Sequence, residues 1–269
     1  MAITKFQLNI LQIISRNRVL SGESYFAGGA ALNSLIEAPR LSNDIDLFHD
    51  TSEAVRWAVG EDSEALRAAD YQVDIEIDRE AFVEALVSVG EEYCRLQWVQ
   101  DSAYRFFPLA EHPDFGLVLH PFDLATNKVL ALVGRAVPRD WVDIIECDSR
   151  LQPLGYLVWA AAGKDPGLNP SYILDQAARS VRYTEIELSE VNFVGTRPTA
   201  AELSIGWRRT MESARSVVEA LPWQRVGECV IDRAGELIRL DAASLTNALK
   251  KDEVRFHAGS LYGAFPVFV

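Results

Sequence analysis

Cysteine is scarce in this sequence, and no run of apolar residues is long enough to cross a membrane. The three cysteines, Cys94, Cys147 and Cys229, are scattered without metal-type spacing, and their odd number argues against a disulfide framework. The longest apolar runs, such as residues 156–162, are far shorter than a membrane span. Polar residues interrupt the apolar ones near the N-terminus, which predicts an amphipathic helix and not a signal peptide. We therefore expect reduced thiols, no membrane partner and a cytoplasmic location.

Histidine and positive charge are also in short supply. The four histidines show no ligand spacing, and neither a phosphate-binding Walker loop nor a Ser/His/Asp arrangement is evident. The net charge is −13, from 26 basic and 39 acidic residues, which argues against a protein whose main task is to grip a nucleic-acid backbone. The same balance suits an enzyme in which divalent cations mediate between an acidic protein and an acidic substrate.

The chain is ordinary in composition and long enough for two domains. Of its 269 residues, 49% are hydrophobic and 24% are charged, which is typical of a globular protein with a sizeable core. Helical and strand patterns alternate up to about residue 150, and mainly helical patterns follow. We therefore predict a mixed domain over residues 1–150 and a mainly helical domain over residues 151–269.

Two carboxylates stand two residues apart in the segment Ser42–Phe48. Asp44 and Asp46 alternate with the apolar residues Ile45 and Leu47, which predicts a strand with one face in the core. Because residues two apart on a strand point to the same face, both carboxylates share the opposite face. Hard divalent cations prefer such oxygen ligands and also bind polyphosphates. Asp44 and Asp46 are therefore candidate metal ligands.

A pair of glycines precedes these acids. Gly28 and Gly29 follow an aromatic, strand-like run and open a helical stretch from Ala30 to Leu35. Glycine permits a sharp turn and a close approach of the backbone to a phosphate. The start of the following helix presents free N–H groups to an anion. The pair is therefore a candidate phosphate-binding turn, with close packing of the helix on the sheet as the alternative.

The glycine turn within Tyr25–Asn33, followed by Asp-x-Asp, resembles the signature of the nucleotidyltransferase superfamily. More narrowly, the chain is similar to the AbiEii/AbiGii toxin-type nucleotidyltransferases of bacterial toxin–antitoxin and phage-defence systems. Two further segments carry that narrower resemblance, Asp123–Leu132 and Arg135–Asp143. The resemblance covers roughly residues 20–150. It implies an α+β fold, with a nucleotidyltransferase-type mixed β-sheet flanked by helices and a mainly helical C-terminal region.

The resemblance also implies roles for residues around the acid pair. Members of the superfamily hold the β- and γ-phosphates at the glycine turn, which is Gly28 and Gly29 in this sequence. A serine often occupies the second of these positions, and the toxin-type group also tolerates glycine there. Arg40 and Ser42 match the Arg-x-Ser-x-Asp-x-Asp form of that group. Arg40 would then contact the triphosphate, or else it would be a loop arginine in water.

A second set of charges lies on two consecutive predicted helices, the first of which Asp123 would cap. Lys128 and Arg135 are seven residues apart and share a helical face, so both cations can reach one anionic site. The resemblance assigns Lys128 to the triphosphate, and a lysine that reaches solvent from a partly buried helix is the alternative. Asp140 and Asp143 share a face of the next helix. The resemblance makes Asp140 catalytic, whereas neutralisation of Lys128 or Arg135 is its structural alternative.

The sequence departs from the superfamily at a third catalytic carboxylate, which many members place on a later strand. The corresponding predicted strand, Arg95–Val99, offers only Gln97 at this point, and a neutral amide cannot accept a proton at a useful rate. Asp74, Glu76 or Asp101 could take the role, and spacing does not choose among them. An inactive or atypical member is the other interpretation of this departure.

The sequence leaves three functions open. The first is an enzyme that uses Mg²⁺ or Mn²⁺ to move a nucleoside monophosphate from a nucleoside triphosphate to a hydroxyl on RNA, tRNA in particular, or on a protein. By resemblance it would be a toxin restrained by a cognate antitoxin. The second has a small aminoglycoside-like acceptor, which suits the acidic charge better. The third is an inactive nucleotide-binding or interaction module. Residues 151–269 would bind the acceptor in the enzyme.

Overall fold

The computed structural model describes residues 2–135, 137–181 and 183–267 and divides into two compact units. Unit 1 comprises the chain up to residue 103 together with residues 108–120, and unit 2 comprises residues 104–107 and the chain from residue 121. The main boundary lies at residue 120 and not at the expected residue 150. The reason is that helices α4 (Pro121–Arg135) and α5 (Pro138–Arg150) pack with helices that follow them in the sequence.

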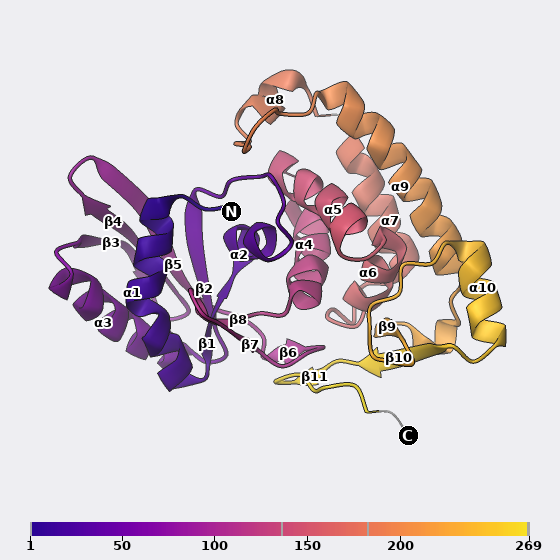
Figure 1. Cartoon of the computed structure of the whole chain (residues 1–269), viewed down its shortest axis with the longest axis horizontal. Coiled ribbons are helices and arrows are strands. Elements are labelled where there is room, and N and C mark those ends of the chain that lie inside the picture. The colour runs from indigo at the N-terminus through magenta and orange to yellow at the C-terminus, as the bar shows by residue number, and fades with distance from the viewer. Residues whose placement is uncertain (1, 136, 182, 268–269) are drawn as a thin grey trace. The chain divides into compact units, whose positions relative to one another are not determined.

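Unit 1 is built on a seven-stranded mixed sheet (Figure 1). Its strands span Ser24–Ala27 (β1), Asp44–His49 (β2), Gln72–Arg79 (β3), Phe82–Val89 (β4), Glu92–Gln100 (β5), Ala110–His112 (β7) and Gly116–Val118 (β8). The strand order is β3-β4-β5-β2-β1-β8-β7. β2 pairs in parallel with β5 and antiparallel with β1, and β1 pairs in parallel with β8. The mixed sheet expected from the sequence is therefore confirmed.

The helices of unit 1 are α1 (Lys5–Ser21), α2 (Gly28–Leu35) and α3 (Ser52–Ala68). α1 and α3 pack against each other and against strands of the sheet, while α2 contacts β1 and β2 (Figure 1). Thr4 and Gln7 form a capping box that starts α1, and Thr51 accepts a hydrogen bond from the amide of Ala54 at the start of α3. Hydrogen bonds between residues close in the sequence therefore set where α1 and α3 begin.

The central strands bury one face and leave the other half-exposed. On β2, Ile45 and Leu47 are fully buried, whereas Asp44 and Asp46 are half-buried. β4 and β5 show the same alternation of buried and half-exposed residues. We call the half-exposed side of these strands the open face. The acid pair therefore lies on the open face, as the alternation in the sequence predicts.

Unit 2 is mainly helical. Its helices span Pro121–Arg135 (α4), Pro138–Arg150 (α5), Leu154–Ala161 (α6), Pro170–Ala177 (α7), Glu185–Ser189 (α8), Ala200–Ala220 (α9) and Ala242–Lys250 (α10), with 3-10 turns at Ala178–Val181 and Trp223–Arg225. The short strands are Tyr104–Arg105 (β6), Glu228–Asp232 (β9), Val254–Ala258 (β10) and Ser260–Leu261 (β11). α6 packs against both α4 and α9. Its side chains are all buried, which explains its uninterrupted apolar sequence.

Two segments of unit 2 differ from the simplest interpretation of their sequences. Residues 185–193 have strand-like character, yet they begin helix α8, because Thr184 and Glu187 form a capping box. The sequence around residues 233–235 predicts a hairpin, and the chain does turn back there, with the amide of Asp232 donating to the carbonyl of Glu236, but the strand that pairs with β9 is β10. The segment after β9 makes only a single bridge back to it, from Leu237 to Ile231. The side chain of Gln152 donates to the carbonyls of both Val230 and Ile238, and so links that segment to the strand.

The three cysteines are buried free thiols, as expected. Burial raises the pKa of Cys94 to about 12 and raises the pKa values of Cys147 and Cys229 well above the ordinary thiol range. Such thiols are protonated at neutral pH and therefore unreactive. Among the helices of the described residues, none combines the length and the apolar character that a membrane span requires.

Candidate functional site

The acid pair lies beside the glycine turn in unit 1. β1 runs antiparallel to β2 with Ala27 opposite Asp46, so the turn that follows β1 begins next to that carboxylate. Gly28 has φ +68°, a conformation that side-chain-bearing residues rarely adopt. A Cβ at Gly28 would also overlap Oδ2 of Asp46. Glycine is therefore required at this position both by the backbone and by the approach of the carboxylate.

Gly29 has a different neighbour. A Cβ at Gly29 would overlap Nη2 of Arg40, and it would lie 3.6 Å from the hydroxyl of Ser42. Arg40 is buried, with 5% of its surface exposed, and its Nη1 donates to the carbonyl of Leu41 at 3.0 Å. Arg40 is thus held against the glycine turn and is not the solvated loop arginine of the alternative interpretation.

Helix α2 begins at this turn. Ala27 occupies the N-cap position and has no side-chain oxygen to accept a hydrogen bond from the first turn. The first N–H groups of a helix have no intrahelical acceptor, and they carry the positive end of the helix dipole. The backbone N–H groups at Gly28 and Gly29 and the guanidinium of Arg40 therefore form an electropositive edge beside the carboxylate of Asp46. Helix N-termini are favourable sites for phosphate, and carboxylates are ordinary ligands of hard divalent cations.

The structure brings together six of the residues expected for the site, all in unit 1: Gly28, Gly29, Arg40, Ser42, Asp44 and Asp46. The other three, Lys128, Arg135 and Asp140, lie in unit 2, as does Asp143, which shares a face of α5 with Asp140. Ala136, within the expected segment Arg135–Asp143, lies outside the described residues. The ten residues therefore form two clusters, each of which is described by itself.

The unit 2 cluster is a buried network of ion pairs. Nζ of Lys128 lies 3.0 Å from Oδ1 of Asp140 and 3.1 Å from Oδ2 of Asp143, and both carboxylates are fully buried. Arg135 donates two hydrogen bonds to Asp140, from Nε at 2.6 Å and from Nη2 at 2.9 Å. Each cation of α4 is therefore paired with an acid of α5.

The network sets the charge of its central acid. Burial acts to raise the pKa of Asp140, but hydrogen bonds from Arg135 and the charge of Lys128 outweigh it, so the pKa lies below the ordinary value. Asp140 is therefore ionised at neutral pH. These contacts are those of the structural alternative, in which Asp140 neutralises Lys128 and Arg135, and a phosphate role for Lys128 stays a prediction.

The sequence suggested that Asp123 caps helix α4, but the structure shows a different role for it. α4 begins at Pro121, and the side chain of Asp123 accepts hydrogen bonds from the amides of Phe106 and Phe107 at 2.9 and 3.1 Å. Nζ of Lys164 lies 2.8 Å from Oδ1 of Asp123. The fully buried carboxylate therefore ties the β6 segment to α4 and has a structural role that spacing alone does not reveal.

None of the three carboxylates considered for the third acid lies next to the acid pair. Asp74 on β3 is separated from Asp44 on β2 by strands β4 and β5. These three strand spacings place it roughly 14 Å away. Glu76 lies at an irregularity in β3, 3.7 Å from Nε of Arg95. Asp101 follows β5, where its amide donates to the carbonyl of His49 at the far end of β2.

Glu84 lies on the open face of β4, and its sequence position did not indicate it as a candidate for the site. Glu84 is opposite Gln97 on β5, and Gln97 is in turn opposite Asp46 on β2. The sequence around Glu84 is compatible with a helix or with a strand. The signal for a strand is that the apolar residues Val83, Ala85 and Val87 occupy every second position, which leaves Glu84 on the opposite face. Across the described part of the chain, no three His, Cys, Asp or Glu side chains gather in a way that could hold a metal ion.

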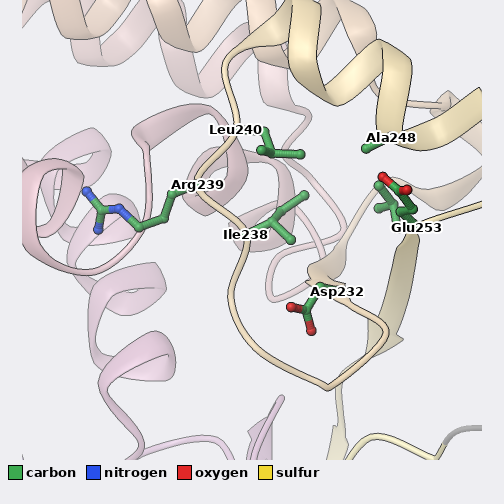
Figure 2. A pocket seen from close by; sticks show the side chains of 7 residues that line it. Asp232, Ile238, Arg239, Leu240, Ala248 and Glu253 are labelled. Carbon is green, nitrogen blue, oxygen red and sulfur yellow. The ribbon is translucent and has the colours of Figure 1, made fainter. Parts of the chain in front are cut away.

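A separate pocket of about 300 Å³ lies within unit 2 (Figure 2). Its lining combines apolar side chains with the carboxylates of Asp232 and Glu253. The side chain of Arg239 extends away from the other labelled residues (Figure 2), and it donates to the carbonyls of Asp148 and Ser149. None of the residues expected for catalysis lines this pocket.

Comparison with known proteins places this geometry in a family. No curated protein matches the chain in sequence. Among solved structures, JHP933 from Helicobacter pylori is similar at 14% identity and a TM-score of 0.53, over 81% of this chain and 95% of that one. MenT4, a nucleotidyltransferase toxin from Mycobacterium tuberculosis H37Rv, is similar at 17% identity and a TM-score of 0.53, over 81% and 83%. The family model of the nucleotidyl transferase AbiEii toxin of type IV toxin–antitoxin systems matches residues 12–220, so the chain belongs to this family of nucleotidyltransferases.

Proposed function

We propose that this nucleotidyltransferase moves a nucleoside monophosphate from a nucleoside triphosphate to a hydroxyl of RNA, tRNA in particular, with Mg²⁺ or Mn²⁺ as the cation. A cognate antitoxin restrains it. The observation that carries the proposal is that the Asp46 carboxylate fills the space that a Cβ of Gly28 would occupy, at the start of helix α2. It joins a cation ligand to a phosphate-binding turn within one unit.

In the proposed reaction, the acceptor oxygen forms a bond to the α-phosphorus. The bond from that phosphorus to the bridging oxygen breaks, pyrophosphate leaves, and the hydroxyl proton passes to solvent. The main demands on the protein are positioning and the stabilisation of charge on phosphate oxygens. A bound divalent cation would supply that stabilisation as a Lewis acid, and Asp44 and Asp46 would hold it.

The glycine turn takes the triphosphate in this proposal. The N–H groups at Gly28 and Gly29 donate to phosphate oxygens, and the buried guanidinium of Arg40 adds a fixed positive charge beside them. The hydroxyl of Ser42, close to Gly29, is a further donor. Each donor is held by the backbone or by burial, so little ordering is required when the nucleotide binds.

Unit 2 has two proposed tasks. Lys128 and Arg135 bind the nucleotide, with Asp140 keeping both cations in place through the contacts described above. Residues 151–269 bind the acceptor. A small cationic acceptor is the second candidate, because the net charge of −13 attracts a cation and repels RNA.

The test is transfer of label from each α-³²P-labelled nucleoside triphosphate, with Mg²⁺, to total bacterial RNA or to a cationic aminoglycoside. The wild type is compared with the D44N/D46N double variant. We expect label in RNA with the wild type and no label with the variant. Label in the aminoglycoside alone would favour the second acceptor. Equal transfer by the variant would overturn the assignment of the acid pair.

The antitoxin is tested separately. The wild type is expressed in bacteria with and without the neighbouring gene, and growth is measured. We expect growth arrest by the wild type alone, relief by the neighbouring gene, and no arrest by the D44N/D46N variant. Arrest that persists in the variant would contradict a toxicity that depends on nucleotidyl transfer.

A further inference from the structure

A row of polar side chains crosses the open face of the sheet from β2 to β4. The parallel register of β2 and β5 places Gln97 opposite Asp46, and the antiparallel register of β5 and β4 places Glu84 opposite Gln97. Side chains of residues that face one another across neighbouring strands lie on the same side of the sheet. Asp46, Gln97 and Glu84 are therefore lateral neighbours in that order.

The amide of Gln97 has a fixed orientation. Its Nε2 lies 2.5 Å from Oε2 of Glu84. A carboxylate only accepts hydrogen bonds, so the amide atom that faces Glu84 must be the N–H donor. The oxygen of the amide diverges from the nitrogen at the same carbon and is thus directed away from β4. Glu84 therefore decides which end of Gln97 is presented to the strand that carries Asp46.

Glu84 is itself held in place. Only 13% of its side chain is exposed, and its second oxygen, Oε1, lies 3.8 Å from Nε of Arg95. Its two oxygens thus face different partners on β5, Gln97 and Arg95. A charge-assisted hydrogen bond of 2.5 Å to a mostly buried carboxylate is a strong restraint on the amide that donates it.

We propose that Gln97 is a cation ligand of this site through its amide oxygen and that Glu84 is the positioning residue that turns that oxygen toward Asp46. The inference rests on the proposed function, since Asp44 and Asp46 hold the cation. Amide oxygens are ordinary ligands of hard divalent cations. The arrangement supplies a third protein oxygen at the point where the acid pair has no third carboxylate beside it.

The charge of the site follows from this assignment. Asp44 and Asp46 together balance one divalent cation, and Gln97 adds an oxygen without adding charge. Glu84 keeps its negative charge one strand further away, where it orients the amide. Outer partners of this kind typically change metal affinity by about 10- to 100-fold when they are removed.

The test is Mn²⁺ binding by the nucleotide-free protein, followed by the loss of the free Mn²⁺ signal in electron paramagnetic resonance. The single variants are Q97M, which keeps the volume but has no amide oxygen, and E84A, which frees the amide. We expect each to weaken Mn²⁺ binding by about 10-fold or more. E91Q, which removes an exposed carboxylate in the turn between β4 and β5, is the control and should bind as the wild type does.

A swapped pair tests whether residue 97 lies within ligand distance of the cation. The E84Q/Q97E double variant keeps the composition, the net charge and a carboxylate–amide hydrogen bond, but it places the carboxylate beside Asp46. The proposal expects tighter Mn²⁺ binding than in the wild type, since a charged ligand replaces a neutral one. A residue 97 that lies outside ligand distance of the cation would leave Mn²⁺ affinity nearly unchanged in the swapped variant, because solvent screens the added charge.

The outcomes distinguish this inference from the function on which it rests. If D44N/D46N binds Mn²⁺ as the wild type does, the cation site itself is wrong. If that variant loses binding while Q97M and the swapped pair match the wild type, only the role of Gln97 and Glu84 is overturned. Circular dichroism of each variant checks folding, and the swapped pair keeps the test valid if Q97M does not fold.

Discussion

The carboxylate of Asp46 occupies the space in which a side chain at residue 28 would stand. The strand that carries the acid and the turn that precedes helix α2 are therefore matched to each other, and no side chain can be added at residue 28 without displacing the carboxylate of Asp46. The glycine turn and the acid pair, which are separate in the sequence, are therefore in direct contact in the structure.

Substitution G28A should disable the site. The positive φ of Gly28 costs an alanine about 1–2 kcal/mol, and the added Cβ displaces the carboxylate of Asp46. We expect lower stability in urea unfolding and loss of detectable nucleotidyl transfer. The matched control is G90A, because Gly90 also has a positive φ, +58°, but has no atom within 4 Å of an added Cβ.

In G90A the alanine has the same unfavourable backbone conformation, but its Cβ does not overlap any neighbouring atom. G90A should lose about 1–2 kcal/mol of stability and keep its transfer activity. Equal activity in G28A and G90A would show that the position of the Asp46 carboxylate next to the turn is unimportant for the reaction.

Substitution K128M tests the two roles left open for the unit 2 network. Removal of the ammonium from two fully buried carboxylates should cost about 3–5 kcal/mol of unfolding free energy. The K128M/D143N variant also removes one of those charges and should recover part of the loss. Urea unfolding of the wild type and both variants measures these differences.

Nucleotide affinity of the same proteins then decides the role of the lysine. If Lys128 binds phosphate, K128M/D143N should bind nucleoside triphosphates at least about 10-fold more weakly than the wild type, the equivalent of about 1.4 kcal/mol. Calorimetric titration measures this. Normal affinity in the double variant would leave Lys128 with the structural role alone.

His49 should make the protein less stable in acid. Burial lowers the pKa of His49 from 6.5 to about 4, so the unfolded state takes up a proton more readily than the folded state. Its contribution is complete above pH 6.5 and is lost as the pH falls toward 4, by about 1.4 kcal/mol per pH unit at most.

The H49L variant isolates this contribution. Leucine has no titratable group, and it removes a buried ring nitrogen, Nε2, that has no hydrogen-bond partner. Unfolding free energies between pH 7 and pH 4.5 should therefore fall less steeply for H49L than for the wild type. Parallel curves for the two proteins would mean that His49 does not titrate differently in the folded state.

The sequence predicted those parts of unit 1 whose patterns are local. The alternation around Asp44 and Asp46 describes a strand with a buried face, and β2 is that strand. Gly28 and Gly29 mark a turn that opens a helix, and α2 begins there. In both cases the residues that define the pattern also make the contacts, so no knowledge of distant segments was necessary.

The parts that the sequence did not predict depend on distant partners. Asp123 looks like a helix cap until Phe106 and Phe107 come to its side chain from an earlier segment. Gln97 looks like the loss of a carboxylate until the register of β4 places Glu84 against it. Spacing along the chain holds no information on such pairings between strands and segments.

The β6 segment has a consequence for how the chain can be divided. Since residues 104–107 belong to unit 2, the backbone passes between the units after residues 103, 107 and 120. A fragment that starts at residue 121 lacks the strand that pairs with β11, the amides that Asp123 binds, and the carbonyl of Phe106 that His257 contacts. No single cut therefore releases either unit whole, and the two units are expected to be made, folded and degraded as one inseparable chain.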